Sequence, residues 1–292
     1  MRVLVTGEKS YVGLNLKKWL SQWNDRYIID FISLKNDKWK NIDLSNYDVL
    51  FHVAALVHKK EQPEMENLYY RINRDLTLEL AIKAKRDGVK QFIFMSSISV
   101  YGLDGLFGEK QEINQSTPCC PISFYGKSKL EAEILLNKIN DENFKVVIVR
   151  APMIYGPHCP GNYSRLRKLA FYTPIFPSIF NERSMIFIDN LSEFLRLIIE
   201  EQCHGLFFPQ NKEYVNTSQL VKLISNENSK NLLLSKSLGK LVKLMGYKKI
   251  AKKLFGNLVI DPSLSEYKQF SYCIADLPKS INISEKNIEK GV

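Results

Sequence analysis

The chain opens with the stretch Arg2-Val3-Leu4-Val5-Thr6-Gly7-Glu8-Lys9-Ser10-Tyr11-Val12-Gly13. Its first part, residues 2–6, is a short and mostly apolar run that ends at a glycine, as in a strand buried within a parallel sheet. Val12, Leu16 and Leu20 then recur every four residues, which is typical of the buried face of a helix. Where a strand passes through a tight glycine turn into a helix, free backbone N–H groups point at a pyrophosphate. The opening stretch therefore predicts a dinucleotide-binding start.

The rest of the chain repeats this alternation of strands and helices. Further strand-like runs occupy 27–34, 49–53, 91–95, 145–149, 185–188 and 205–208, with helical patterns at 67–87, from Tyr125 onward and at 190–201. Six or seven strands alternating with helices predict an α/β fold with a doubly wound parallel sheet. Regularity breaks between 151 and 183, which indicates a substrate-binding insertion. We predict a first domain of residues 1–150, to which 184–208 returns, and a smaller C-terminal α/β substrate-binding lobe of 151–183 and 209–292.

The composition is that of an ordinary globular protein, with 292 residues, 45% hydrophobic and 25% charged. Five cysteines without metal-ligand spacing or a secretory leader predict no metal site and a reducing, cytoplasmic location. No apolar run approaches the roughly 20 residues that span a bilayer. The net charge of +10 fits a lysine-rich surface with a basic site for a phosphorylated substrate. No zinc-finger or aromatic RNA-platform motif supports nucleic acid as a partner.

The C-terminal third carries a second charge signal. Residues 217–254 read as helical, and 236–253 hold seven lysines interleaved with apolar residues. The pattern fits the solvated face of a small helical lobe. The alternative is an amphipathic helix that associates weakly with an anionic membrane surface.

The clearest chemical signal is the stretch Tyr125-Gly126-Lys127-Ser128-Lys129. Residues four apart lie one turn apart on the same helical face, so Tyr125 and Lys129 are neighbours. A phenol has an ordinary pKa of about 10, and a nearby ammonium lowers the pKa by favouring the phenolate. The spacing therefore predicts a proton donor and acceptor tuned toward the working pH.

Small and polar residues follow the predicted strands. Ser96-Ser97-Ile98-Ser99 places three hydroxyls after the fourth strand, at the edge where α/β sheets bind ligands, and Ala54-Ala55 after the third strand let a cofactor approach the backbone. In the second strand, Asp30 lies at the spacing of a ribose ligand but could be mid-strand. Ser33, with Lys35 close by, would then hold that position and suit a 2′-phosphate. The sequence leaves NAD and NADP open.

Two polar residues within predicted elements are interpreted as structural. His52 reads as a packed strand residue in preference to a catalytic base. Asn73, within the predicted helix 67–87, reads as the donor or acceptor of a buried hydrogen bond.

Taken together, Thr6–Gly13, Ser96–Gly102, Tyr125–Lys129 and Arg150–Pro157 resemble the extended short-chain dehydrogenase/reductase family. More narrowly they resemble its NAD-dependent epimerase/dehydratase branch, which acts on nucleotide sugars, over about residues 1–200. The resemblance implies a Rossmann domain with bound NAD or NADP, and a small C-terminal domain that closes over a UDP-linked or similar sugar. It also implies a homodimer formed through the helices around 67–87 and 125–140.

Carried over by position, the resemblance implies a catalytic triad of Ser97, Tyr125 and Lys129. Tyr125 would exchange a proton with a sugar hydroxyl, Ser97 would hydrogen-bond the same oxygen, and Lys129 would bind the nicotinamide ribose and lower the pKa of the tyrosine. Besides Ser33, cofactor contacts are expected at Gly7, Ser10, Tyr11, Val12, Gly13, Asp43, Leu44, Ala54, Ala55, Tyr125 and Lys129. Substrate contacts are expected at Ser99, Asn162, Arg165 and Arg183, of which Arg183 would clamp the diphosphate bidentately.

Departures from the family pattern decide which reaction the sequence favours. Ser10 replaces the middle glycine of the pyrophosphate loop, and Met153 and Ala151 replace residues typical of UDP-galactose 4-epimerases. The stretch 150–166 resembles enzymes that make N-acetylated 6-deoxy sugars for surface polysaccharides. The leading prediction is reduction of a UDP-4-keto-6-deoxy-N-acetylhexosamine at C4. The rival is a UDP-hexose or UDP-N-acetylhexosamine 4-epimerase.

Two further alternatives are less favoured. A dehydratase would carry an Asp-Glu pair after the catalytic serine or threonine, where this chain has Ile98-Ser99-Val100. A non-catalytic dinucleotide sensor would typically lose the tyrosine or the lysine, and both are present here.

Overall fold

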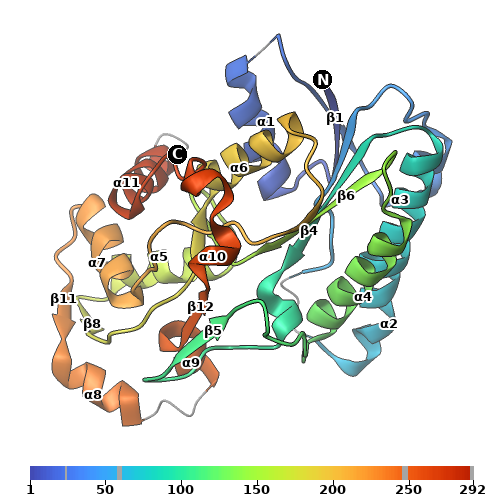
Figure 1. The fold of residues 1–292 in the computed structure, drawn as a ribbon. Helices are drawn as coiled ribbons and strands as arrows, with labels where there is room; N and C mark the ends of the chain where they lie inside the picture. The colour runs from blue at the N-terminus through green and yellow to red at the C-terminus, as the bar shows by residue number, and fades with distance from the viewer. Residues whose placement is uncertain (24, 58–60, 245–248, 290–292) are drawn as a thin grey trace. The chain divides into compact units, whose positions relative to one another are not determined.

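The computed structural model describes residues 1–23, 25–57, 61–244 and 249–289 (Figure 1). The chain divides into two compact units. Unit 1 contains Met1–Gly102, Pro118–Ala151 and Ser192–Pro209, and unit 2 contains Leu103–Thr117, Pro152–Leu191 and Gln210–Val292. The sequence prediction kept 103–117 with the first domain and 184–191 with its return, whereas both segments cluster with unit 2.

Unit 1 is built on a six-stranded parallel sheet in the order β10-β6-β4-β3-β1-β2. The strands are β1 (Arg2–Thr6), β2 (Ile28–Ile32), β3 (Val49–His52), β4 (Gln91–Ser97), β6 (Lys145–Ala151) and β10 (Gly205–Phe207). The chain moves from β1 to one edge and then crosses back to β3, so the order reverses between these two strands. The predicted doubly wound parallel sheet is confirmed, and its ligand-binding switch point lies at the carboxyl ends of β1 and β3.

Helices cover both faces of this sheet because the pleat alternates side chains between them. On one face, Phe92 and Phe94 of β4 join a buried cluster with residues of α3 (Leu76–Arg86) and α4 (Phe124–Ile139). On the other, α1 (Tyr11–Leu20) and α6 (Ile188–Glu200) are tied by a 2.9 Å hydrogen bond from Trp19 Nε1 to Glu193 Oε2. Figure 1 shows α3 and α4 running side by side.

The helix predicted over 67–87 contains an irregular turn. It begins as α2 (Glu66–Tyr70), widens into a π-turn at Arg71–Asp75 and continues as α3. Asn73 in this turn binds the backbone of Leu56 through both amide atoms, with Leu56 N to Oδ1 at 2.8 Å and Nδ2 to Leu56 O at 3.2 Å. The predicted buried hydrogen bond of Asn73 is therefore present, and π-turns of this kind recur at functional sites.

Unit 2 is organised around three short parallel strand pairs. They are β5 (Lys110–Ile113) with β12 (Asn257–Ile260), β7 (Met153–Tyr155) with β9 (Met185–Phe187), and β8 (Ile175–Pro177) with β11 (Leu233–Ser235). The run at 185–188 is thus a strand, as predicted, but it does not join the main sheet. Helices α5 (Asn162–Tyr172), α7 (Thr217–Glu227), α10 (Pro262–Ser265) and α11 (Leu277–Glu289) complete the unit.

The prediction of continuous helix over 217–254 is wrong. The chain leaves α7, forms β11, and then forms α8 (Lys236–Leu244) and α9 (Lys249–Phe255). Leu233 pairs with Ile175, 58 positions earlier in the chain, and this non-local pairing overrides the local helical pattern. Residues 245–248, in the middle of the predicted lysine-rich helix, lie outside the described part of the chain. Among the described residues, no helix is both long and apolar enough to cross a bilayer.

Candidate active site

The predicted dinucleotide turn lies at the switch point of the sheet. Gly7 follows β1 with φ +83°, a conformation that favours glycine, and its N–H donates to Ile32 O at 2.9 Å. A Cβ added to Gly7 would lie 3.4 Å from the Cβ of Ala54, which follows β3. The carboxyl ends of β1, β2 and β3 therefore meet beside the small residues Gly7 and Ala54. The cofactor contacts expected at Gly7, Ala54 and Ala55 stay a prediction.

The start of α1 fits an anionic group. A Cβ on Gly13 would lie 2.8 Å from Val5 Cγ1 and closer still to Ser10 Oγ, so only glycine allows this approach of helix to strand. Ser10 precedes the helix, and its Oγ is buried without a hydrogen-bond partner in the described part of the chain. The first-turn N–H groups of a helix, which include those of Val12 and Gly13, have no intrahelical acceptor. Donors without acceptors at a glycine turn match a dinucleotide pyrophosphate.

Behind this turn, a closed polar network fixes the protonation state of His52. Thr77 Oγ1 donates to Asn73 O at 2.9 Å, so His52 Nε2 donates to Thr77 Oγ1 and Nδ1 accepts from Thr6 Oγ1, each at 2.9 Å. Thr6 Oγ1 also accepts the N–H groups of Val53 and Ala54. Burial lowers the pKa of His52 to about 3, with the Lys129 charge adding to the effect. His52 is therefore a packed, neutral strand residue, as its place in the sequence indicated.

The structure resolves the position of Asp30. It is the third residue of β2 and binds Arg2 Nη2 at 2.9 Å and Tyr47 Oη at 3.0 Å, so it lies mid-strand with its carboxylate occupied. Ser33 is the first residue beyond β2, next to the Ile32 carbonyl that accepts the Gly7 N–H. Of the two alternatives, Ser33 has the position expected of a ribose contact.

Asp43 and Leu44 are not brought to this edge. Leu44 is fully buried in the apolar cluster beneath α3, and its N–H donates to Asp87 Oδ2, just before β4 begins. Asp43 is exposed and accepts from Ser45. Only four residues separate Leu44 from the start of β3. The pair therefore lies at the amino ends of the strands, roughly 15 Å from the glycine turn.

Ser97, Tyr125 and Lys129 come together at the end of β4. Tyr125 lies in the first turn of α4, and the Ser97 side chain is close enough to its phenol to favour the phenolate form. Lys129, one turn further, is 1% exposed; its Nζ donates to Met95 O at 2.8 Å and lies 6.0 Å from the centroid of the Tyr125 ring. Ser99 extends the group, because its N–H donates to Ser97 Oγ at 3.1 Å.

The electrostatics of this cluster differ from the expectation. Burial raises the pKa of Tyr125 to about 12, although the Ser97 hydrogen bond opposes the change. Burial lowers the pKa of Lys129 to about 7, against the pull of Glu133. Lys129 is therefore only partly charged near neutral pH, and burial outweighs any lowering of the Tyr125 pKa by its ammonium.

A buried ion pair lies one turn beyond Lys129. Glu133 is 2% exposed, accepts the Ser96 hydroxyl and pairs with Arg150, with Nη2 to Oε2 at 2.6 Å. Arg150 Nη1 donates to Tyr101 Oη at 2.7 Å. Burial opposes the charge of Arg150, but Glu133 more than offsets it and raises the pKa of the guanidinium. Positions 125, 129 and 133 share one face of α4, a spacing in the sequence that could have revealed Glu133.

Two other residues shape the start of α4. Glu61 accepts the backbone N–H groups of Phe124 and Tyr125, each at 3.1 Å, and so places a carboxylate at the helix N-terminus. A Cβ on Gly126 would lie 2.5 Å from Ser99 O, so the glycine after Tyr125 allows the helix to approach the strand end. No local sequence signal marks Glu61, which lies in a loop far from Tyr125 in the chain.

The predicted substrate residues other than Ser99 belong to unit 2. Asn162 and Arg165 are exposed in the first turn of α5. Arg183 precedes β9, and its Nη1 donates to Gly256 O at 2.9 Å. Burial lowers the pKa of Arg183, while Asp104 opposes the change. A desolvated guanidinium is suited to bind phosphate oxygens.

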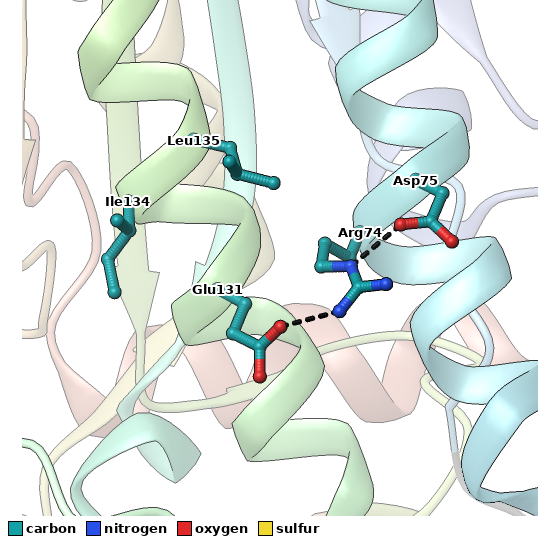
Figure 2. A pocket seen from close by; sticks show the side chains of 5 residues that line it. All are labelled: Arg74, Asp75, Glu131, Ile134 and Leu135. Carbon is teal, nitrogen blue, oxygen red and sulfur yellow. Dashed lines mark hydrogen bonds and ion pairs between the residues drawn. The ribbon is translucent and has the colours of Figure 1, made fainter.

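A pocket on the opposite side of α4 does not belong to this site. Figure 2 shows it lined by Arg74, Asp75, Glu131, Ile134 and Leu135, with Arg74 donating to both carboxylates at 2.7 Å. These α4 positions lie on the other face of the helix from Tyr125 and Lys129. The predicted homodimer would use this helical surface, and it stays a prediction.

A doubly wound sheet with a glycine turn at its switch point, and a serine, tyrosine and lysine at the end of the fourth strand, define a short-chain dehydrogenase/reductase. Comparison with known proteins narrows the class. The family model of the NAD dependent epimerase/dehydratase family matches residues 3–173. This chain belongs to the NAD-dependent epimerase/dehydratase family.

Individual relatives agree with this assignment. A UDP-glucose 4-epimerase from Vibrio cholerae is 31% identical over 75% of this chain and 74% of that protein. An N-acetyl-α-D-glucosaminyl-diphospho-ditrans,octacis-undecaprenol 4-epimerase from Escherichia coli O157:H7 is 26% identical over 79% of this chain and 73% of that protein. The UDP-glucuronic acid 4-epimerase from Bacillus cereus, solved with NAD, shares the fold with a TM-score of 0.74 and 20% identity, covering 99% of this chain and 97% of that one.

Proposed function

We propose that this protein is an NAD-dependent oxidoreductase that acts at C4 of a nucleotide-linked sugar. The observation that carries the proposal is the meeting of Ser97, Tyr125 and Lys129 at the carboxyl end of β4, beside a switch-point turn that fits a dinucleotide. NAD, when bound, would accept and return a hydride. Gly7, Ser10, Val12 and Gly13 would hold its pyrophosphate, with Ser33 at the adenosine ribose.

The protein's own residues would handle the proton. The Ser97 hydroxyl and the Tyr125 side chain would both hydrogen-bond the C4 oxygen. The Tyr125 phenolate would take the hydroxyl proton during oxidation, and the resulting phenol would return it during reduction. Lys129, with a pKa near 7, can gain or lose charge at working pH and so follow the charge of the phenol. Arg183 of unit 2 would bind the diphosphate.

Between the two reactions left open by the sequence, the relatives favour 4-epimerisation of a UDP-hexose or UDP-N-acetylhexosamine. Two curated relatives with 31% and 26% identity are 4-epimerases. The second candidate is reduction of a UDP-4-keto-6-deoxy-N-acetylhexosamine. Met153 and Ala151 favour it, because both depart from the residues of UDP-galactose 4-epimerases.

One experiment separates these candidates. Purified protein is denatured to identify any released dinucleotide, and is incubated separately with UDP-glucose, UDP-N-acetylglucosamine and the 4-keto sugar, with NADH and NADPH in parallel. Co-purified NAD with interconversion of C4 epimers supports the epimerase. Stoichiometric consumption of reduced dinucleotide with the keto sugar supports the reductase. No change in any sugar, with Tyr125→Phe indistinguishable from wild type, would overturn both.

A further inference from the structure

Unit 2 exposes apolar side chains where its peripheral strand pair meets α8. Ile175 of β8 and Leu233 of β11 are registered partners in this pair, and they are 47% and 60% exposed. On α8, Leu241 and Leu244 are 54% and 77% exposed. Figure 1 shows β8, β11 and α8 grouped within unit 2. Large apolar side chains exposed on contiguous elements mark an interaction surface more often than isolated ones do.

The packing of α8 fixes which way these leucines point. Gly239 is buried against the backbone of Ser178, and a Cβ there would collide with the Ser178 carbonyl oxygen. Leu241 and Leu244 turn away from this contact, and Lys240 and Lys243 are exposed beside them. The outer side of α8 therefore carries Leu241 and Leu244, with the exposed Lys240 and Lys243 along one side of them.

The charge of this region is uniform. Residues 228–260 contain eight lysines and no aspartate or glutamate, in a chain whose net charge is +10. Residues 162–181, which supply α5 and β8, also contain no acidic residue. The segment that carries Leu233, Leu241 and Leu244 is thus uniformly positive.

The charge and the exposed leucines favour an anionic membrane over a second copy of this chain as the partner of this surface. A second copy docked symmetrically would bring two lysine-rich patches together with no acidic residue of 228–260 between them, and like charges disfavour that contact. A layer of anionic lipid headgroups over an apolar interior complements both the lysines and the leucines.

We propose that the face formed by Ile175, Leu233, Lys240, Leu241, Lys243 and Leu244 docks this protein on an anionic membrane surface. The leucines would enter the boundary between headgroups and acyl chains, while the lysines contact the headgroups. The proposal is independent of the reaction at Tyr125, and either could hold without the other.

The test is sedimentation of the full-length protein with two kinds of vesicles, phosphatidylcholine alone and an equal mixture of phosphatidylcholine and phosphatidylglycerol. Wild type should sediment with the anionic vesicles, and less at high salt because screening weakens the lysine contribution. Lys240→Gln/Lys243→Gln should bind about 30-fold more weakly, at roughly fivefold per lysine. Leu241→Ser/Leu244→Ser should lose roughly tenfold or more, because buried apolar area is lost.

Matched controls keep the test specific. Lys18→Gln/Lys138→Gln removes the same charge from exposed positions of unit 1, and Ile82→Ser removes a side chain 51% exposed on α3. Both controls should bind like wild type, and circular dichroism melts should show that every variant is folded. Failure of wild type to sediment would refute the proposal. So would equal losses in the controls, or a change of the leucine variant from dimer to monomer without a change in vesicle binding.

Discussion

Replacing Lys129 by Met should make the protein more stable at neutral pH while it removes activity. Lys129 is 1% exposed, lies 4.3 Å from the centroid of the Phe94 ring and donates to Met95 O at 2.8 Å. Methionine keeps an unbranched side chain of similar length in this apolar space. It removes the ammonium and its hydrogen bond.

The magnitude follows from the pKa of the buried amine. Burial lowers the pKa of Lys129 from 10.5 to about 7, and each pKa unit corresponds to about 1.4 kcal/mol. At and below neutral pH, the lysine therefore lowers the free energy of unfolding by about 4–5 kcal/mol. Leaving the Met95 carbonyl without its donor costs about 1–3 kcal/mol. The net expectation is that Lys129→Met raises the free energy of unfolding by about 1–4 kcal/mol at pH 7.

The sign of the pH dependence provides a second, sharper expectation. Between pH 7 and 10.5 the unfolded chain keeps a proton on this amine that the folded chain has released. The wild type should therefore gain stability as pH rises through this window, at up to about 1.4 kcal/mol per pH unit. The Met variant lacks this contribution, so its advantage should shrink with rising pH and vanish at about pH 8–10.

Urea unfolding followed by tryptophan fluorescence measures the free energy of unfolding of unit 1, which contains Lys129 and all three tryptophans. The protein is first freed of nucleotide and compared at pH 7 and 9.5. Lys138→Met, at an exposed position of the same helix, should show no pH-dependent difference from wild type. Two results would refute the claim that the buried ammonium lowers the free energy of unfolding. One is a Lys129→Met variant that is less stable than wild type at pH 7. The other is a difference in stability between variant and wild type that does not change with pH.

Three further outcomes follow from the same site. Tyr125→Phe should lower turnover by about 10²–10⁴-fold while the affinity for NAD, measured by calorimetry, stays within about twofold. Glu133→Gln should lower the free energy of unfolding by about 3–5 kcal/mol in urea titrations, because it leaves the buried Arg150 guanidinium without its counter-charge, and an unchanged midpoint would refute the pairing. The ring proton signals of His52 should not shift between pH 5 and 8 in NMR spectra, since burial lowers its pKa to about 3.

The sequence was sufficient for features that depend on local patterns. The parallel sheet follows from apolar runs and helical spacings, and the turn at Gly7 follows from a glycine at the end of such a run. Tyr125 and Lys129 share a helical face because four residues make about one turn. These signals are periodic or adjacent in the chain, so no tertiary information is needed to read them.

Other features depend on contacts between distant segments, and these the sequence did not reveal. The strand at Leu233 exists because Ile175 pairs with it, whereas its neighbours favour a helix. Glu61 reaches the start of α4 from a loop more than 60 positions earlier. The low pKa of Lys129 arises because Phe94 and the end of β4 desolvate it, and residue spacing does not report desolvation.

On α4, Lys129 lies one turn from Tyr125 and one turn from Glu133. Its pKa of about 7 is the balance of two opposing effects. Glu133, one turn away, favours the ammonium form of Lys129, while it also pairs with Arg150 at 2.6 Å. Burial prevails, and the pKa of Lys129 settles at about 7. At that value, one additional charge nearby can shift the lysine to either protonation state.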